Sequence, residues 1–315
     1  MFIDIQRCCM LLGTADDILI LCHKSPDGDT IGSAYGLYHA LVSIGKRAAV
    51  VCSDPLPEKF SYIHQGIVMP QFTPRFIVAV DIASEGLLGR ELEQYAGRIN
   101  LCIDHHVSNT GYAAHTLLDA EAAAACEIMC SVIRHLGVPF TKPMADALYT
   151  GTITDTGCFR YPNTTANTLR TAAALIEQGA DSAGITNRLF ETVSRSRMLL
   201  ESRILDTIQF HFQERCASIV MSRALLDELG AKTEDLEGIV SIPRRIEGVD
   251  AAVAFRENPD GTYKISLRTS EAVNASEVCA LFGGGGHARA AGCTVCGPLE
   301  QAMQQVLAAV GKVLN

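Results

Sequence analysis

The sequence has no tryptophan, few other aromatic residues, no long apolar run and no excess of basic residues. The missing tryptophan by itself excludes nothing. No apolar run approaches the roughly 18–20 residues that a membrane-spanning helix needs, and residues 1–12 contain no cleavable signal pattern. The formal net charge is −9, which argues against a broad basic face for gripping long double-stranded nucleic acid. We therefore expect neither a membrane nor long duplex nucleic acid as a partner.

Cysteine is the one unusually frequent residue type. Twelve cysteines would indicate a disulfide framework in a short secreted chain, but this chain has 315 residues and no signal pattern. We expect most of these thiols to be small buried hydrophobic groups. The Cys293–Cys296 CxxC pair has no second pair that would complete a zinc site. The pattern predicts a protein of the reducing cytoplasm.

The first half of the chain alternates short apolar runs with helical patterns. At 315 residues and 48% hydrophobic content, the chain suits two domains of ordinary size. Near-continuous apolar strands separated by helices are typical of a parallel sheet covered on both faces. The sequence therefore predicts an α/β fold with a parallel sheet. The expected strands are Ile18–Cys22, Ala48–Cys52, Phe76–Val80 and Ile99–Ile103, and the expected helices are Thr30–Ile44, Leu87–Tyr95, Glu121–Leu136, Lys142–Ile153, Thr164–Glu177 and Ser182–Glu191.

The pattern changes after residue 192. A periodic segment rich in Arg and Glu, Ser194–Phe210, predicts a connecting helix. Further on, Asn258–Gly261 is a strong hairpin turn. A short helix that carries Arg289 is expected after the glycine run Gly283–Gly286, and a final helix at Leu299–Leu314. We predict an N-terminal domain over residues 1–192, a linker helix over 193–213 and a smaller α/β domain over 214–315. The expected strands of the second domain are Ala217–Met221, Ala251–Phe255 and Lys264–Arg268.

Ionisable residues gather where the first predicted strand ends. His23, Asp27 and Asp29 follow the run Ile18–Cys22, and ligands of parallel α/β sheets bind at the carboxyl ends of strands. The competing reading is that Ser25–Asp29 is an ordinary turn and that Asp29 caps the next helix. This motif alone does not decide between the two readings.

Three further segments offer the same residue types. Asp81 follows the third predicted strand, Asp104-His105-His106 follows the fourth, and Asp155 ends a helical segment. If the segments converge, they supply four carboxylates and two imidazoles as metal ligands, a mixture that suits Mn²⁺. That number is too large for one open catalytic ion. We therefore expect two divalent ions, most naturally Mn²⁺, that share a bridging carboxylate.

In order and character these four motifs resemble those of the DHH phosphoesterase superfamily. The later run Gly283-Gly284-Gly285-Gly286-His287 resembles the GGGH motif of the DHH-associated domain found in the RecJ-type and NrnA-type branch. Agreement extends to Thr154–Tyr161 and to Ser266-Leu267-Arg268, so the resemblance covers essentially the whole chain. It implies a metal-binding catalytic domain followed by a substrate-binding domain. The compact length is similar to the NrnA type, which hydrolyses short oligoribonucleotides and 3′-phosphoadenosine-5′-phosphate.

The resemblance also implies a role for each site residue. Asp81 would bridge the two ions, and Asp104 would orient a ligand. His106 would face the substrate phosphate, stabilising its charge or protonating the leaving oxygen. One ion would be held by His23, Asp27 and Asp81, and the other by Asp29, Asp81, His105 and Asp155.

Charge balance predicts a second set of site residues. Four ligand carboxylates cancel two divalent ions, so the substrate phosphate needs other cations. Candidate substrate-binding groups are Arg160, Arg268, His287 and the backbone N–H groups of Gly284, Gly285 and Gly286. We expect a bounded site that prefers short oligomers or mononucleotides. The resemblance implies short oligoribonucleotides, linear dinucleotides and 3′-phosphoadenosine-5′-phosphate as substrates. The alternatives are an inorganic pyrophosphatase, a cyclic di-AMP phosphodiesterase and a non-catalytic nucleotide sensor. The sequence leaves open whether the chain forms a homodimer.

Overall fold

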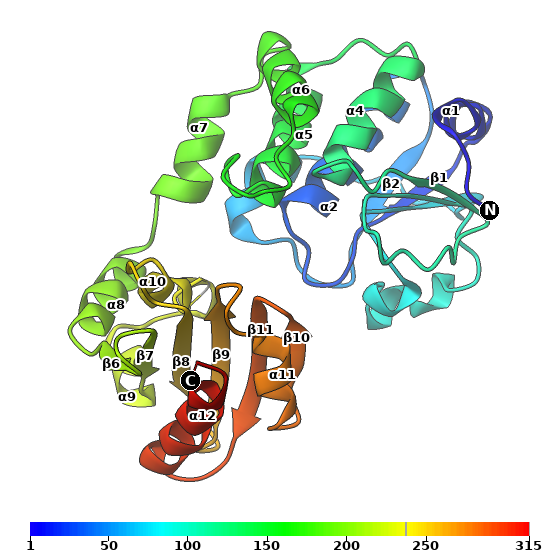
Figure 1. Ribbon diagram of the computed structural model, residues 1–315. Helices are drawn as coiled ribbons and strands as arrows, with labels where there is room; N and C mark the ends of the chain where they lie inside the picture. Colours follow the sequence, from blue (N-terminus) through cyan, green and yellow to red (C-terminus); the bar gives the residue numbers. More distant parts are fainter. Residues whose placement is uncertain (237, 315) are drawn as a thin grey trace. The chain divides into compact units, whose positions relative to one another are not determined.

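The computed structural model describes residues 1–236 and 238–314. The chain divides into two compact units (Figure 1), unit 1 over Met1–Thr192 and unit 2 from Val193 onward. In the described residues, no helix is both long enough and apolar enough to cross a bilayer.

Unit 1 is built on a parallel sheet of five strands in the order β2-β1-β3-β4-β5. The predicted α/β fold is therefore confirmed. Because β1 pairs with both β2 and β3, the strand order reverses beside β1, and such a switch point is where open α/β sheets bind ligands. The strands are β1 Ile18–Leu21, β2 Ala48–Val51, β3 Phe76–Val80, β4 Leu101–Asp104 and the unpredicted edge strand β5 His115–Leu118.

The helices of unit 1 mostly follow the predicted pattern. One correction concerns Leu87–Tyr95, which does not form a single helix. Gly89 has φ 78°, a left-handed conformation that interrupts a helix, and short 3₁₀ segments lie at η2 Glu85–Leu87 and η3 Arg90–Tyr95. The other helical elements are α1 Ile5–Thr14, α2 Gly28–Ser43, η1 Glu58–Phe60, α3 Ser61–His64, α4 Ala125–His135, α5 Lys142–Asp155, α6 Ala166–Glu177, α7 Ser182–Thr186 and the π-helical turn η4 Asn187–Glu191.

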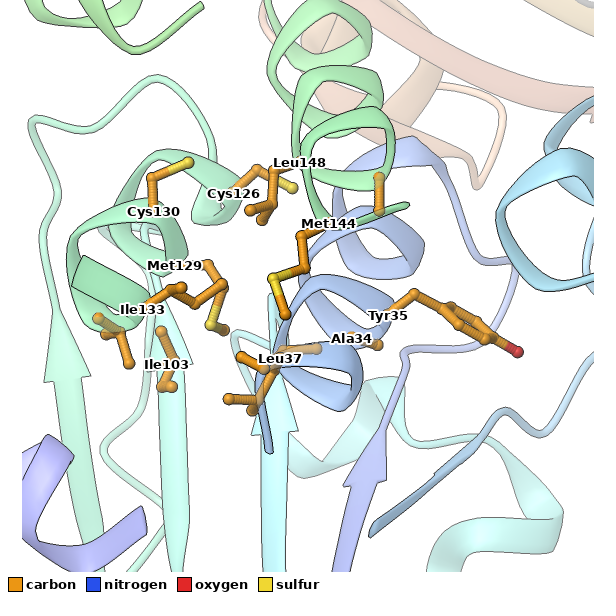
Figure 2. Close-up of a cluster of buried hydrophobic side chains, with 14 of the residues drawn as sticks. Ala34, Tyr35, Leu37, Ile103, Cys126, Met129, Cys130, Ile133, Met144 and Leu148 are labelled. Atoms are coloured by element: carbon orange, nitrogen blue, oxygen red, sulfur yellow. The ribbon is translucent and has the colours of Figure 1, made fainter. Parts of the chain in front are cut away.

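Helices α2, α4 and α5 form the layer that positions the site. Figure 2 shows their apolar side chains packed together, with Met129 and Ile133 of α4 beside Ile103 of β4. Helices α2 and α5 approach very closely at Gly32, where an added Cβ would overlap the carbonyl oxygen of Ala147 and lie 2.9 Å from Cys126 Sγ. This contact between backbones leaves no room for a side chain.

Unit 2 is a six-stranded sheet in the order β10-β11-β9-β8-β7-β6, antiparallel except for the β7–β8 pair. The predicted Asn258–Gly261 turn joins β8 to β9. The strands are β6 Gln209–His211, β7 Cys216–Met221, β8 Ala251–Glu257, β9 Tyr263–Thr269, β10 Gly285–His287 and β11 Ala290–Val295. The helices are α8 Arg195–Leu205, α9 Arg223–Glu228, η5 Thr233–Leu236, α10 Ser241–Arg244, α11 Ala275–Ala280 and α12 Leu299–Leu314.

Two local expectations for this unit are wrong. The helix predicted over Ser194–Phe210 ends at Leu205, because Gln209–His211 pairs with β7 and forms β6. The glycine run is followed by a hairpin instead of a helix. There β10 pairs with β11, and the two-residue turn contains Arg289. Both errors arise because pairing with the next strand along the chain overrides a local helical pattern.

The close contact at Gly32 predicts a stability effect. Gly32→Ala should lower the free energy of unfolding by about 1–3 kcal/mol, since the methyl group overpacks the α2–α5 interface. The matched control is Gly13→Ala in α1, where an added Cβ meets nothing within 4 Å and should stabilise the helix by about 0.5–1 kcal/mol. Urea unfolding of both variants checks the prediction, and equal effects at the two positions would contradict it.

Candidate metal centre

The candidate site lies at the carboxyl ends of three neighbouring strands. His23 follows β1, Asp81 follows β3, and Asp104 is the last residue of β4. Asp81 has φ 60°, a left-handed conformation that is strained for a non-glycine residue. Its backbone N–H donates to the carbonyl of Ile103 at 2.9 Å, which holds the Asp81 side chain beside the end of β4.

The first ligand group combines His23, Asp27 and Asp81. His23 Nε2 lies 3.5 Å from Asp27 Oδ1 and 3.6 Å from Asp81 Oδ2. Asp27 is the N-cap of α2, and its Oδ1 accepts hydrogen bonds from the N–H groups of Asp29 and Thr30 at 3.0 and 3.2 Å. The cap fixes the carboxylate at the start of the helix, so capping and ligation are compatible roles for Asp27.

The second group is centred on His105, which follows β4. Its Nε2 lies 3.4 Å from Asp81 Oδ1, 3.4 Å from Asp155 Oδ2 and 3.8 Å from Asp29 Oδ2. Asp155 is the last residue of α5, and its side chain reaches this point. Three sets have candidate ligand atoms that lie within 4.8 Å of one another: His23, Asp27 and Asp81; Asp29, His105 and Asp155; and Asp81, His105 and His106. Asp81 therefore contributes to both sides of the site.

Two buried atoms indicate that these residues fit a metal. Asp81 Oδ1 and His105 Nε2 are buried and have no hydrogen-bond partner. A buried polar atom without a partner carries a desolvation cost of about 1–3 kcal/mol. Both atoms face the same point, and the donor set of carboxylates and imidazoles matches hard or borderline divalent ions. The residues present therefore suit divalent cations.

Asp29 has a structural partner as well as a place in the second group. Its fully buried carboxylate accepts hydrogen bonds from the N–H groups of Ala125 at 2.6 Å and Cys126 at 2.9 Å. These are the first two residues of α4, whose own N-cap, Ala124, provides no side-chain cap. Asp29 therefore caps α4 from a different helix, and the positive end of the helix dipole stabilises its charge.

The site concentrates negative charge and alters the pKa values of its members. Burial and the neighbouring carboxylates raise the pKa of Asp29 to about 7 and that of Asp155 to about 9. Burial opposes protonation of the imidazoles, but nearby carboxylates outweigh it. They raise the pKa of His105 to about 10 and that of His23 to about 11. Without metal, the site therefore holds protons at neutral pH.

A hydrogen-bonded chain runs from Asn109 through Asp104 to His106. His106 Nδ1–H donates to Asp104 Oδ1 at 2.8 Å, and Asn109 Nδ2 donates to Asp104 Oδ2 at 2.6 Å. Asp104 is fully buried, whereas the His106 side chain is 43% exposed. Hydrogen bonding to Asp104 raises the pKa of His106. The chain orients the imidazole with Nε2 as its remaining free nitrogen, an arrangement suited to proton transfer.

Asn109 is a site residue that the sequence pattern did not predict. The local signal was weak: Asn109 N donates to the carbonyl of His106 at 3.0 Å, a turn that returns its side chain to Asp104. Within this loop, Asn109 Oδ1 also accepts from Gly111 N at 2.8 Å. An Asn three residues after a His is too common a pattern to be read as functional without this geometry.

The predicted substrate-binding residues lie in both units. Arg160, in unit 1, donates its Nε–H to the carbonyl of Gly157 at 2.7 Å and stacks over Phe190. In unit 2, Arg268 of β9 and His287 of β10 both lie opposite Ala290 of β11. Cross-strand partners project to the same face of a sheet. Arg268 and His287 therefore share one face, with Gly285 and Gly286 beside His287 in β10.

Comparison with known proteins supports the same reading. Residues 17–152 match the DHH family, N-terminal domain, and residues 217–315 match the DHHA1 domain. The bifunctional oligoribonuclease and PAP phosphatase NrnA of Thermus thermophilus is 36% identical over 306 residues, which is 95% of this chain and 90% of that protein.

Solved structures share the fold. An exopolyphosphatase-related protein from Bacteroides fragilis superposes with a TM-score of 0.89 at 26% identity, covering 98% of this chain and 96% of that one. The exonuclease RecJ bound to manganese superposes with a TM-score of 0.51 at 14% identity, covering 98% of this chain and 93% of that one. These matches, together with the paired DHH and DHHA1 domains, confirm the resemblance read from the sequence. The chain belongs to the DHH family of phosphoesterases, in the branch that carries a DHHA1 domain.

Proposed function

We propose that this phosphoesterase hydrolyses short oligoribonucleotides, linear dinucleotides and 3′-phosphoadenosine-5′-phosphate in the cytoplasm. The observation that carries the proposal is the convergence of two ligand groups on the shared carboxylate Asp81. The Thermus thermophilus relative is an oligoribonuclease and PAP phosphatase, which favours oligoribonucleotides and 3′-phosphoadenosine-5′-phosphate as substrates.

The metal assignment follows from the two ligand groups. His23, Asp27 and Asp81 hold one divalent ion; Asp29, Asp81, His105 and Asp155 hold the other. Mn²⁺ is the preferred ion, because the donors are carboxylates and imidazoles and the RecJ exonuclease of the same fold was solved bound to manganese. Such ions, when bound, activate water and polarise a phosphoryl group.

The remaining residues bind and protonate the substrate. His106, oriented by Asp104, donates a proton toward the leaving oxygen. Arg160 supplies positive charge from unit 1. Arg268, His287 and the Gly284–Gly286 backbone of unit 2 bind phosphate, and Arg268 and His287 can do so together because they lie on one face of the sheet.

A substrate panel tests the proposed function. With Mn²⁺, the enzyme should hydrolyse pApA, a five-nucleotide RNA and 3′-phosphoadenosine-5′-phosphate faster than cyclic di-AMP or pyrophosphate. Released phosphate and nucleotides are measured directly. Hydrolysis of pyrophosphate alone would make the chain an inorganic pyrophosphatase, and preference for cyclic di-AMP would support the cyclic dinucleotide alternative.

Removal of the shared carboxylate tests the metal assignment. Asp81→Asn should lose high-affinity binding at both positions and reduce kcat by at least about 10³-fold, because both ions lose a charged ligand. The control Asp206→Asn makes the same change at an exposed carboxylate and should behave as wild type. Metal content after dialysis and calorimetric titration with Mn²⁺ provide the measurement. A variant that still binds two ions would refute the bridging role.

The raised pKa values predict that metal binding is coupled to proton release. His105, with a pKa of about 10, and Asp155, with a pKa of about 9, hold protons at pH 7 in the metal-free protein, and ligands must be deprotonated to bind metal. Mn²⁺ affinity should therefore increase as pH rises from 6 to 9. Calorimetry at pH 7 in two buffers of different ionisation enthalpy should report at least one proton released per binding event, and zero release would contradict this account.

A further inference from the structure

One face of the unit 2 sheet is only partly covered. Helices α11 and α12 pack on the face that carries Val253 and Ile265. On the opposite face, α8 and α10 form a cluster with Ile219 and Ala254, which belong to β7 and β8. This second cluster includes no residue of β9 or β11. The side chains of β9 on this face are Lys264, Ser266 and Arg268, of which Lys264 is exposed and the other two are half-buried.

Two cations lie directly opposite each other on this face. Lys264 of β9 is the register partner of Arg256 of β8, and like charges at directly opposed positions destabilise a sheet. Among the described residues, no acidic side chain lies within ion-pair distance of either cation.

Two acidic groups close to Arg256 have other partners. Asp227 and Glu257 line the same small pocket as Arg256. The guanidinium of Arg223 binds Asp227 at 2.7 Å, and the backbone N–H of Arg223 donates to Glu257 at 2.8 Å. The Lys264–Arg256 pair therefore has positive charge that no acidic side chain neutralises within residues 193–236 and 238–314.

The cations continue a row that begins at the proposed phosphate-binding residues. Lys264, Ser266 and Arg268 alternate along β9, so they point to one face at intervals of about 7 Å. An extended single strand presents its phosphates as a similar row of regularly spaced negative charges. Charge complementarity and continuity with Arg268 identify the occupant as the next part of the same nucleic acid strand.

We propose that Lys264 and Arg256 form a binding subsite for phosphates of an oligoribonucleotide beyond the dinucleotide held at Arg268 and His287. The subsite rests on the proposed function and specifies it further: it makes the enzyme favour RNA of three to five nucleotides over dinucleotides. The formal net charge of −9 is compatible with this subsite, because the subsite needs only a local row of cations.

The experiment compares pA₅ with pApA in the full chain. Lys264→Ala should lower the ratio of kcat/KM for pA₅ to kcat/KM for pApA about fivefold. The double variant that also carries Arg256→Ala should lower this ratio further. Arg268→Ala should lower the hydrolysis rate of both substrates. Lys264→Arg should keep the wild-type ratio. The matched control is Lys312→Ala, which removes an exposed lysine from α12 on the other face of the sheet and should leave both rates unchanged.

Binding without turnover provides an independent readout. In EDTA, anisotropy of labelled pA₅ should show weaker binding to Lys264→Ala. The slope of log affinity against log salt should be about 0.7 shallower than for wild type, as expected for one lost phosphate contact on a single strand.

An unchanged pA₅-to-pApA ratio, or an equal change in the Lys312 control, would overturn the subsite. If the wild-type enzyme hydrolyses neither substrate, the proposed function fails. The anisotropy measurement then tests the subsite by itself: equal pA₅ affinity for wild type and Lys264→Ala would overturn the subsite as well.

Discussion

The hydrogen bonds that join the buried Asp29 carboxylate to the first two N–H groups of α4 determine how the site is built. They connect α2 to α4 at a point where the backbone of α5 also approaches, because an added Cβ at Gly151 would lie 2.8 Å from Asp29 Oδ1. Three helices therefore meet at one carboxylate, and Asp155 at the end of α5 lies beside it. A larger residue at Gly151 would separate the elements that carry the ligands.

This arrangement places more negative charge in a small volume than a folded chain ordinarily tolerates. Burial of an unpaired carboxylate is costly, and Asp29 and Asp81 are both nearly inaccessible to solvent. The metal-free protein limits the cost by keeping protons on its histidines, by raising the pKa of Asp155 and by directing helix N–H groups at Asp29. Divalent cations neutralise the same charge more completely. The crowded carboxylates therefore account both for the negative charge of the site and for its affinity for metal.

The ends of the central strands could be predicted from sequence because β1, β3 and β4 are continuous apolar runs, each followed by an ionisable residue. The edge strand β2 was also predicted, but the edge strands β5, β6 and β10 could not be. β5 begins with His115, and β6 and β10 are three-residue strands defined by their partners. The cap that Asp29 provides for α4 joins residues 96 and 97 positions apart. Asn109 likewise becomes meaningful only through its contact with Asp104. Pairings of this kind depend on tertiary structure and leave no local pattern.

The two units differ in the sign of the charge that they leave uncompensated. Unit 1 gathers carboxylates around Asp81, whereas the partly covered face of the unit 2 sheet carries Arg268, Lys264 and Arg256. Opposed like charges in a sheet cost about 0.2–1 kcal/mol, and an exposed position such as Lys264 could hold a neutral residue without loss of packing. A row of cations can neutralise a phosphodiester chain, while its scissile phosphate needs metal ions, whose candidate ligand sets among the described residues lie in unit 1. One substrate class therefore accounts for the uncompensated charge of both units, and a small anion such as pyrophosphate would leave the outer part of the row without a partner.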